Sequence, residues 1–306
     1  MSLQPRWERE LVVLDRDVAE GEFQRSLALI AGVSGLLTGL EVGLEHRQGS
    51  YGSRIMYTPV ALSAAVFAAG VAGAVKPRLA RTWLPLASWV LIADGVVGFG
   101  FHIRGIHRKP GGWGQLVTNV AMGPPLFAPL LLGIGGFLGV IASLLRPEGS
   151  QPRLPAPVAT WPEETLGKVG EEMAAAVRTG RFQKALCVAT SVSSVLNGLE
   201  ALYSHYRSRF YMRAQWVPIL IAPALAVTGA AAVVSPKVAR TWLPALSGVA
   251  TVAGTVGSAY HVRGLMRRPG GWRQAFYNLT YGPPTFAPLL FAASGFLGLL
   301  ASRLRR

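Results

Sequence analysis

Eight long apolar stretches, separated by shorter polar segments, dominate this chain. They cover residues 27–44, 59–75, 83–101 and 124–145 in the first half, and residues 185–203, 216–234, 242–260 and 283–302 in the second. A helix needs about 20 residues to cross the hydrocarbon core of a bilayer, and these stretches are close to that length. The pattern predicts an all-α integral membrane protein with eight transmembrane helices.

The two halves of the chain are similar in sequence. A shift of 159 residues aligns them without a gap from Phe23 to Arg146, and 26 of the 45 residues from His102 to Arg146 are identical to their counterparts. This internal repeat predicts two tandem four-helix bundles. Because each bundle crosses the membrane an even number of times, both have the same orientation, and the repeats are parallel.

The repeat divides the chain into four segments. Residues 1–22 are predicted to be an N-terminal surface segment, and residues 23–146 the first membrane repeat. Residues 147–181 form a proline-rich linker that ends in a surface helix, and residues 182–306 form the second membrane repeat. The first segment has no apolar run followed by a small-residue cleavage site, so we expect no removable signal peptide.

Composition agrees with a membrane location. Only 15% of the residues are charged, whereas soluble domains carry roughly 25%. The net charge of +15 does not indicate nucleic-acid binding, because the cations flank the apolar stretches. The single cysteine, Cys187, excludes an intrachain disulfide. The expected surroundings are membrane lipid and, for a redox role, other membrane or redox subunits; the oligomeric state does not follow from the sequence.

The predicted topology separates two sides of the membrane. Side A holds the loops 45–58, 102–123, 204–215 and 261–282, and side B holds both termini and the linker. Side B carries 18 Lys and Arg residues and side A carries 12, which favours cytoplasmic termini in a bacterial inner or plasma membrane. The side A loops contain one acidic residue, Glu45, so this side is strongly cationic and should attract anions.

Histidines are the first candidate for chemistry, because all five lie on side A. Four are matched by the repeat, His46 with His205 and His102 with His261. In each half one of them ends the first apolar stretch and the other ends the third, so the two can approach each other across the bundle. Imidazole is a common axial ligand of haem, so the pairs are candidate ligands of haem b. Glycines on the same stretches could let a flat macrocycle approach the helices. Arg104 and Arg263 are candidate partners of its propionates.

Two acidic residues lie deeper, because Glu41 and Glu200 each precede their histidine by five residues. An ionisable group within a span is costly and is therefore a functional candidate. One interpretation makes both glutamates proton acceptors or supporting groups for a cofactor. A second is a non-haem metal site, in which the histidines and a glutamate such as Glu41 converge on one ion. A third is structural, with histidines capping helix ends and no cofactor bound.

The loop before the fourth stretch of each half repeats most closely. Asn119 and Asn278 precede Gly-Pro-Pro, and each is predicted to bond free backbone groups at the start of the following span. Pro129 and Pro288 fall further along the same stretches, where a proline inside a helix produces a kink.

Asp94 is unmatched, because its counterpart is Ala253. It lies near the middle of the third stretch, where an acid can relay protons, meet a cation, or bond to a neighbour such as Ser88. The leading functional hypothesis is a membrane redox or cofactor-binding subunit. The alternatives are a transporter or channel lined by intramembrane carboxylates, and a scaffold or assembly protein that uses the cationic loops.

Overall fold

The computed structural model of the chain describes residues 22–80, 82–144, 175–176 and 179–304. These residues are mostly helical and contain no β-strand. The predicted N-terminal surface segment and the linker with its surface helix lie almost wholly outside the described residues.

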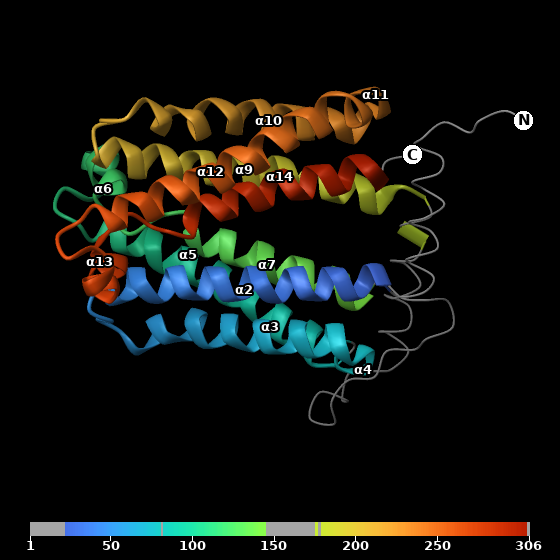
Figure 1. Ribbon diagram of the computed structural model, residues 1–306, viewed down its shortest axis with the longest axis horizontal. Coiled ribbons are helices and arrows are strands. Elements are labelled where there is room, and N and C mark those ends of the chain that lie inside the picture. Colours follow the sequence, from blue (N-terminus) through green and yellow to red (C-terminus); the bar gives the residue numbers. More distant parts are fainter. Residues whose placement is uncertain (1–21, 81, 145–174, 177–178, 305–306) are drawn as a thin grey trace, which may run out of the picture.

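Four long helices make up the first half, residues 22–144, and consecutive ones run in opposite directions (Figure 1). They are α2 (Glu22–Gln48), α3 (Thr58–Val75), α5 (Trp83–His107) and α7 (Ala128–Leu144). The short elements between them are η1 (Arg54–Tyr57), α4 (Pro77–Ala80), η2 (Gly112–Gln115) and α6 (Leu116–Ala121).

The second half, residues 179–304, has the same order of elements. Its long helices are α9 (Arg181–Arg207), α10 (Trp216–Val234), α12 (Trp242–Met266) and α14 (Ala287–Leu304). Its short elements are η4 (Arg213–Gln215), α11 (Pro236–Arg240), η5 (Gly271–Gln274) and α13 (Ala275–Tyr281). Most helix bounds differ from those of the first half by 159 residues, give or take one.

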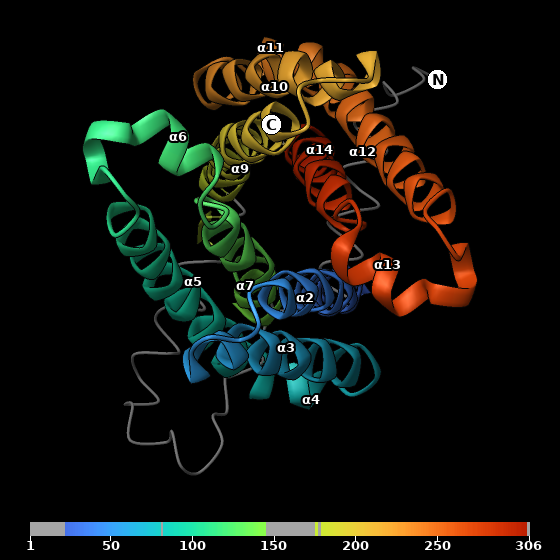
Figure 2. The same cartoon turned by 90° about the vertical axis from the view of Figure 1, so that its left-hand side faces the viewer.

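Each half is a ring of four helices. In the first half, α2 packs on α3 and α7, and α5 also packs on α3 and α7, so α2 and α5 lie diagonally opposite. In the second half, α9 and α12 are related in the same way through α10 and α14. The halves meet through α2, α7, α9 and α14, which surround the centre of the molecule in Figure 2.

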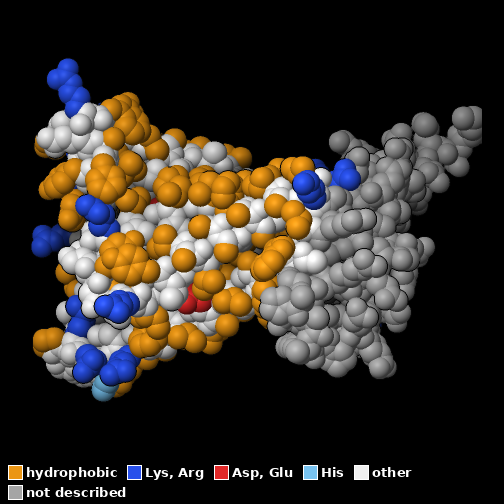
Figure 3. Space-filling model, turned by 90° about the horizontal axis from the view of Figure 1, so that it is seen from below, with side chains coloured by type: hydrophobic (Ala, Val, Ile, Leu, Met, Phe, Trp, Pro, Cys, Tyr) orange, Lys and Arg blue, Asp and Glu red, His pale blue; other side chains and the backbone are white. Residues whose placement is uncertain are grey.

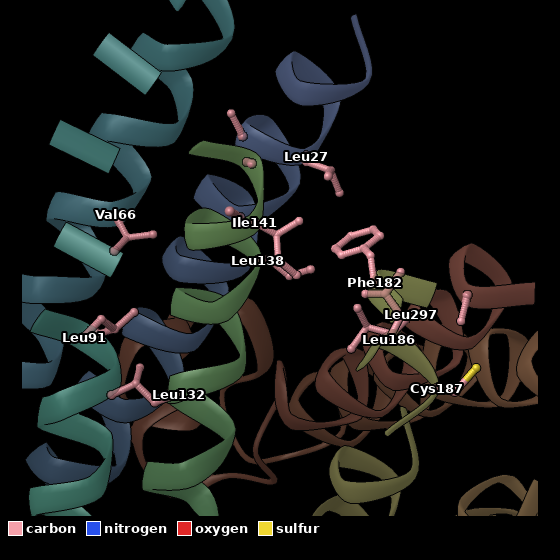
Figure 4. Close-up of a cluster of buried hydrophobic side chains, with 14 of the residues drawn as sticks. Leu27, Val66, Leu91, Leu132, Leu138, Ile141, Phe182, Leu186, Cys187 and Leu297 are labelled. Atoms are coloured by element: carbon pink, nitrogen blue, oxygen red, sulfur yellow. The ribbon is translucent and has the colours of Figure 1, made fainter. Parts of the chain in front are cut away.

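Buried apolar side chains form one cluster that extends across both halves. Figure 4 shows Leu138 and Ile141 of α7 on one side of the boundary, and Phe182 and Leu186 of α9 on the other. This continuity across the boundary supports one assembled body.

Five described helical segments are long and apolar enough to cross a membrane: Gln24–Gln48, Arg54–Val75, Trp83–His107, Arg181–Arg207 and Arg213–Val234. Two apolar helices, Ala128–Ser143 and Ala287–Arg303, are shorter. The helix α12 has the same 25-residue length as α5. It does not reach the same apolarity, since it contains two serines and two threonines, whereas α5 contains one serine and no threonine.

The outer surface of the helices is rich in exposed apolar side chains. Val96, Leu220 and Val227 are examples, with 59%, 67% and 69% of their surface accessible. Figure 3 shows this hydrophobic surface along the helices, with Lys and Arg side chains gathered towards the helix ends. Together with the five long apolar helices, it is compatible with a multi-pass membrane protein.

The predicted kinks at Pro129 and Pro288 are wrong. The apolar stretches begin at residues 124 and 283, but the helices begin only at Ala128 and Ala287. Each proline is therefore the second residue of its helix. There its missing N–H removes no bond from the helix interior.

Candidate functional site

The four matched histidines all lie near the side A end of the molecule, and each is fixed through the same ring nitrogen. Nδ1 of His46 lies 2.6 Å from the carbonyl oxygen of Met56, and Nδ1 of His205 lies 2.9 Å from that of Gln215. These two histidines therefore tie the ends of α2 and α9 to the starts of the helices that follow.

His102 and His261 make the second matched set of contacts. Nδ1 of His102 lies 2.6 Å from the carbonyl oxygen of Pro125, and Nδ1 of His261 bonds to that of Pro284. Both carbonyl groups lie just before the fourth long helix of their half. The histidines of α5 and α12 therefore fix the entry into α7 and α14.

These contacts determine which nitrogen carries the proton. A carbonyl oxygen can only accept a hydrogen bond, so Nδ1 of each histidine must donate it. In the neutral ring, Nε2 then has a free lone pair. A histidine held by an Nδ1–H bond to a backbone carbonyl is the usual form of a metal or haem ligand, because the bond fixes the tautomer and the ring orientation.

The prolines explain why His102 and His261 have carbonyl groups to bind. The helix α7 begins only at Ala128, so the carbonyl of Pro125 lies outside it. If the helix began earlier, this carbonyl would pair with the N–H of residue 129, but that residue is Pro129 and has no N–H. The same spacing separates Pro284 from Pro288. Each histidine supplies the donor that the second proline lacks. Without it, this partly buried carbonyl would lose its described hydrogen bond.

Within each half the two histidines come from diagonal helices and lie close enough to interact electrostatically. His102 of α5 interacts with His46 of α2, and His205 of α9 interacts with His261 of α12. Each half therefore places its two matched histidines at the same end of its bundle.

The predicted metal triad does not assemble. Among the described residues there is no group of three or more His, Cys, Asp and Glu side chains that could hold a metal ion. Glu41 is the predicted carboxylate ligand beside His46 and His102, but it accepts a hydrogen bond from the other half of the chain.

The glycines that were expected to line a macrocycle slot pack against neighbouring helices instead. A methyl group added to Gly39 of α2 would lie 2.6 Å from Cβ of Ser63 of α3. One added to Gly95 of α5 would lie 2.5 Å from the carbonyl oxygen of Pro129 of α7. These glycines therefore allow close helix packing rather than forming the wall of a flat slot.

Arg104 and Arg263 are exposed and do not lie on the same helix face as their histidines. Each follows its histidine by two residues, which is about 200° around an α-helix. The side chains of His102 and His261 are only partly exposed and face the carbonyl groups of the prolines. The structure does not bring these arginines together with the histidine pairs.

Glu41 and Glu200 make reciprocal contacts between the halves. Oε2 of Glu41 in α2 accepts a 2.8 Å bond from the backbone N–H of Phe286, one residue before α14. Oε2 of Glu200 in α9 accepts a 3.1 Å bond from the backbone N–H of Phe127, one residue before α7. The first N–H groups of a helix have no partner within the helix, and a carboxylate there also faces the positive end of the helix dipole.

A further acid and a cation lie close to these glutamates. Glu45 interacts electrostatically with Glu41, Glu200 and Arg207, and Arg207 also interacts with Glu200. Sequence reasoning singled out neither Glu45 nor Arg207 as a site residue. Their counterparts, Ser204 and Gln48, do not share their charge, so the repeat gave no signal for them.

Asp94 bonds to a residue that the sequence analysis did not consider. Oδ1 of Asp94 accepts a 2.6 Å hydrogen bond from the hydroxyl of Thr58 at the start of α3. The suggested partner, Ser88, is fully buried elsewhere and its hydroxyl has no hydrogen-bond partner. In the second half, Val217 and Ala253 occupy the positions of Thr58 and Asp94. The two polar residues are therefore replaced together, a signal that was available in the sequence.

Asn119 and Asn278 fix the preceding loop, and not the start of the fourth helix as predicted. Nδ2 of Asn119 donates to the carbonyl oxygens of Pro110 and Gly112, at 3.0 and 2.8 Å. Nδ2 of Asn278 makes the same two contacts with Pro269 and Gly271. Gly111 and Gly270, between these carbonyl groups, have φ near 77°, a conformation that only glycine adopts readily.

Comparison of the chain with models of protein families, with curated proteins and with solved structures finds no match.

Proposed function

We propose that this chain is a multi-pass membrane protein that binds a cofactor of the haem b class through a pair of histidines in each half. His46 and His102 would supply the ligands in the first half, and His205 and His261 those in the second. One observation carries the proposal. All four histidines donate from Nδ1 to a backbone carbonyl, which leaves Nε2 as the coordinating nitrogen.

Two further features support this choice. The histidines of each pair come from diagonal helices of one four-helix ring, and ligands of a cofactor in a bundle core come from facing helices. A non-haem metal fits less well, since no third ligand joins either pair among the described residues. Haem needs only two axial ligands, and when bound it supplies one-electron transfer.

The membrane topology is part of the proposal. We infer eight spans in two tandem four-helix units, with both termini on the cytoplasmic side of a bacterial inner or plasma membrane. The helices α7, α12 and α14 fall short of the five longest apolar helices in length or apolarity. Each nevertheless packs in its ring as its neighbours do, with an end at side A, and this supports counting all three as spans.

The proposal is tested by absorption spectra of the detergent-purified protein from haem-replete cells, oxidised and then reduced with dithionite. We expect a sharp reduced α-band in the wild type. It should be weakened in His102→Asn and in His261→Asn, and absent when both are combined. Asparagine can still donate its amide N–H to Pro125 or Pro284, so these variants separate ligation from the structural bond.

His107→Asn is the matched control, because His107 has no histidine counterpart and stacks on Trp113 at 5.5 Å between ring centroids. Its spectrum should equal that of the wild type. A featureless wild-type spectrum with no stoichiometric iron, or an α-band that persists in the double variant, would contradict haem ligation by these pairs.

A further inference from the structure

The outward-facing surface of α3 and α5 combines features that the second half lacks. On α5, Asp94 is partly exposed and lies near the middle of a helix long and apolar enough to cross a membrane. Its hydrogen-bond partner is the exposed hydroxyl of Thr58. An ionisable side chain on a lipid-facing surface is costly, so such residues normally face other protein or a polar partner.

Between Thr58 and the exposed Val75 at the end of the helix, the exposed residues of α3 are small. They are Ala61, Ala64, Ala65 and Ala68, which lie on one side of the helix together with Thr58. Their counterparts on α10 are Leu220, Pro223, Ala224 and Val227. Small residues allow the backbones of two membrane helices to approach closely, whereas leucine and valine side chains hold them apart.

The Thr58–Asp94 pair and the small exposed residues of α3 therefore occur together in the first half, and both features are lost in the second. The rest of the surface around them is apolar, with Val90 and Val97 of α5 exposed on either side of Asp94. Figure 3, which views the molecule from the α3 side, shows acidic atoms within this hydrophobic surface. Duplication with later divergence would leave such a difference where only one half meets a partner.

We propose that this face of α3 and α5 docks a membrane-spanning helix of another protein, which presents a lysine or arginine side chain at the level of Asp94. The cation would complete the hydrogen bonding of the carboxylate, and the alanines would receive the backbone of the partner helix. A second copy of this chain does not offer such a cation. Across its described long helices, Lys and Arg lie near the ends, as Arg25, Arg104 and Arg303 illustrate.

Site-specific photocrosslinking in native membranes tests the proposal. A photoreactive amino acid replaces Val97, three residues from Asp94, and in a second protein it replaces Val256, the equivalent exposed valine of α12. We expect a protein adduct at position 97 and only lipid adducts at position 256. Mass spectrometry should place the crosslinked peptide of the partner in a transmembrane segment that contains Lys or Arg.

Two variants show whether the adduct depends on the proposed contacts. Asp94→Asn still accepts a bond from Thr58 but loses the charge, and it should reduce the adduct roughly tenfold, the effect of about 1.4 kcal/mol. Ala61→Leu with Ala68→Val installs the second-half residues and should abolish the adduct. Unchanged detergent elution and circular dichroism confirm that each variant is folded.

Other outcomes overturn the proposal. Lipid adducts alone at both positions would show a lipid-facing surface, and equal protein adducts at both would show no preference for the first half. An adduct that Asp94→Asn leaves unchanged would exclude a cationic partner. An adduct with a second copy of this chain would replace the proposed partner by self-association.

Discussion

The carboxylate of Glu41 in the first half accepts a 2.8 Å hydrogen bond from the backbone N–H of Phe286 in the second half. Glu200 and Phe127 repeat the contact in the opposite direction, at 3.1 Å. Each glutamate thus binds the N-terminal end of a helix that belongs to the other half. These acids were expected to serve a cofactor, but the geometry gives them a role in joining the halves.

Removing this carboxylate should destabilise the assembled protein. Glu41→Ala leaves the Phe286 N–H without its acceptor, because the glutamate is only 7% exposed and water has little access. A hydrogen bond to a charged group contributes about 1.5–3 kcal/mol, so we expect a loss of that order in the free energy of unfolding. The measurement is unfolding by SDS in mixed micelles, followed by circular dichroism.

Glu41→Gln is the control, since its amide oxygen can still accept from Phe286. Glu41→Gln should lower the free energy of unfolding by less than Glu41→Ala does. The bond of Glu200 is longer and its side chain is less buried, so Glu200→Ala should cost no more than Glu41→Ala. Equal stability of Glu41→Ala and the wild type would mean that the contact does not join the halves.

The bond from His102 to Pro125 predicts energetic coupling to Pro129. His102→Ala leaves the Pro125 carbonyl without a donor and should cost about 1–3 kcal/mol. In a Pro129→Ala background, residue 129 has an N–H that can bond the same carbonyl, so His102→Ala should cost less. A double-mutant cycle measured by SDS unfolding gives the coupling energy, expected to be about 1 kcal/mol.

His46→Ala provides the comparison for this cycle. His46 bonds to Met56, and the residue four positions later, Val60, already has an N–H. The loss in the free energy of unfolding caused by His46→Ala should therefore be the same with proline or alanine at position 129. A cycle in which His102 and Pro129 contribute independently would mean that His102 does not replace the missing donor.

The buried amide of Asn119 should be required as a donor. It donates to two carbonyl groups of the preceding loop and is only 5% exposed. Asn119→Asp preserves size but replaces the donor with a second acceptor, which repels both carbonyl oxygens. We expect it to lower the midpoint of thermal unfolding at least as much as Asn119→Ala.

Thr118→Ala is the control for Asn119, because the neighbouring threonine is exposed. It should leave the midpoint unchanged. If Asn119→Asp were as stable as the wild type, the two carbonyl groups would have to be satisfied by something other than this amide.

The helices could be predicted from the sequence because continuous apolar runs leave few alternatives. All eight predicted stretches lie on or overlap long helices of the structure. The start of the fourth helix was misplaced by four residues in both halves, because Pro124 and Pro283 are apolar without being helical. Periodicity does not distinguish an apolar loop from an apolar helix turn.

The candidate residues were identified more successfully than their partners. The repeat pointed to the histidines and to Glu41 and Glu200, since their side chains recur in both halves. Their partners are backbone groups, such as the Phe286 N–H and the Pro125 carbonyl, and every residue type supplies these. Sequence alone therefore gave no means of choosing them. The pairing of Glu41 with the other half depends on how the two bundles dock, which the repeat does not encode.

The hydrogen bond between Thr58 and Asp94 leads to a prediction about the two halves. Thr58→Val leaves the carboxylate of Asp94 without its described donor. Because this hydrogen bond is exposed, the change should lower the free energy of unfolding by about 0.5–1.5 kcal/mol, the net contribution of a typical hydrogen bond. Adding Asp94→Ala reproduces the residues of the second half, Val217 and Ala253, and removes the unsatisfied group. Because both polar partners are then gone, the double variant should be more stable than Thr58→Val alone. The free energy of unfolding of purified protein, measured in SDS mixed micelles without any partner, tests this order. A double variant less stable than either single variant would mean that Asp94 stabilises the first half through contacts other than Thr58.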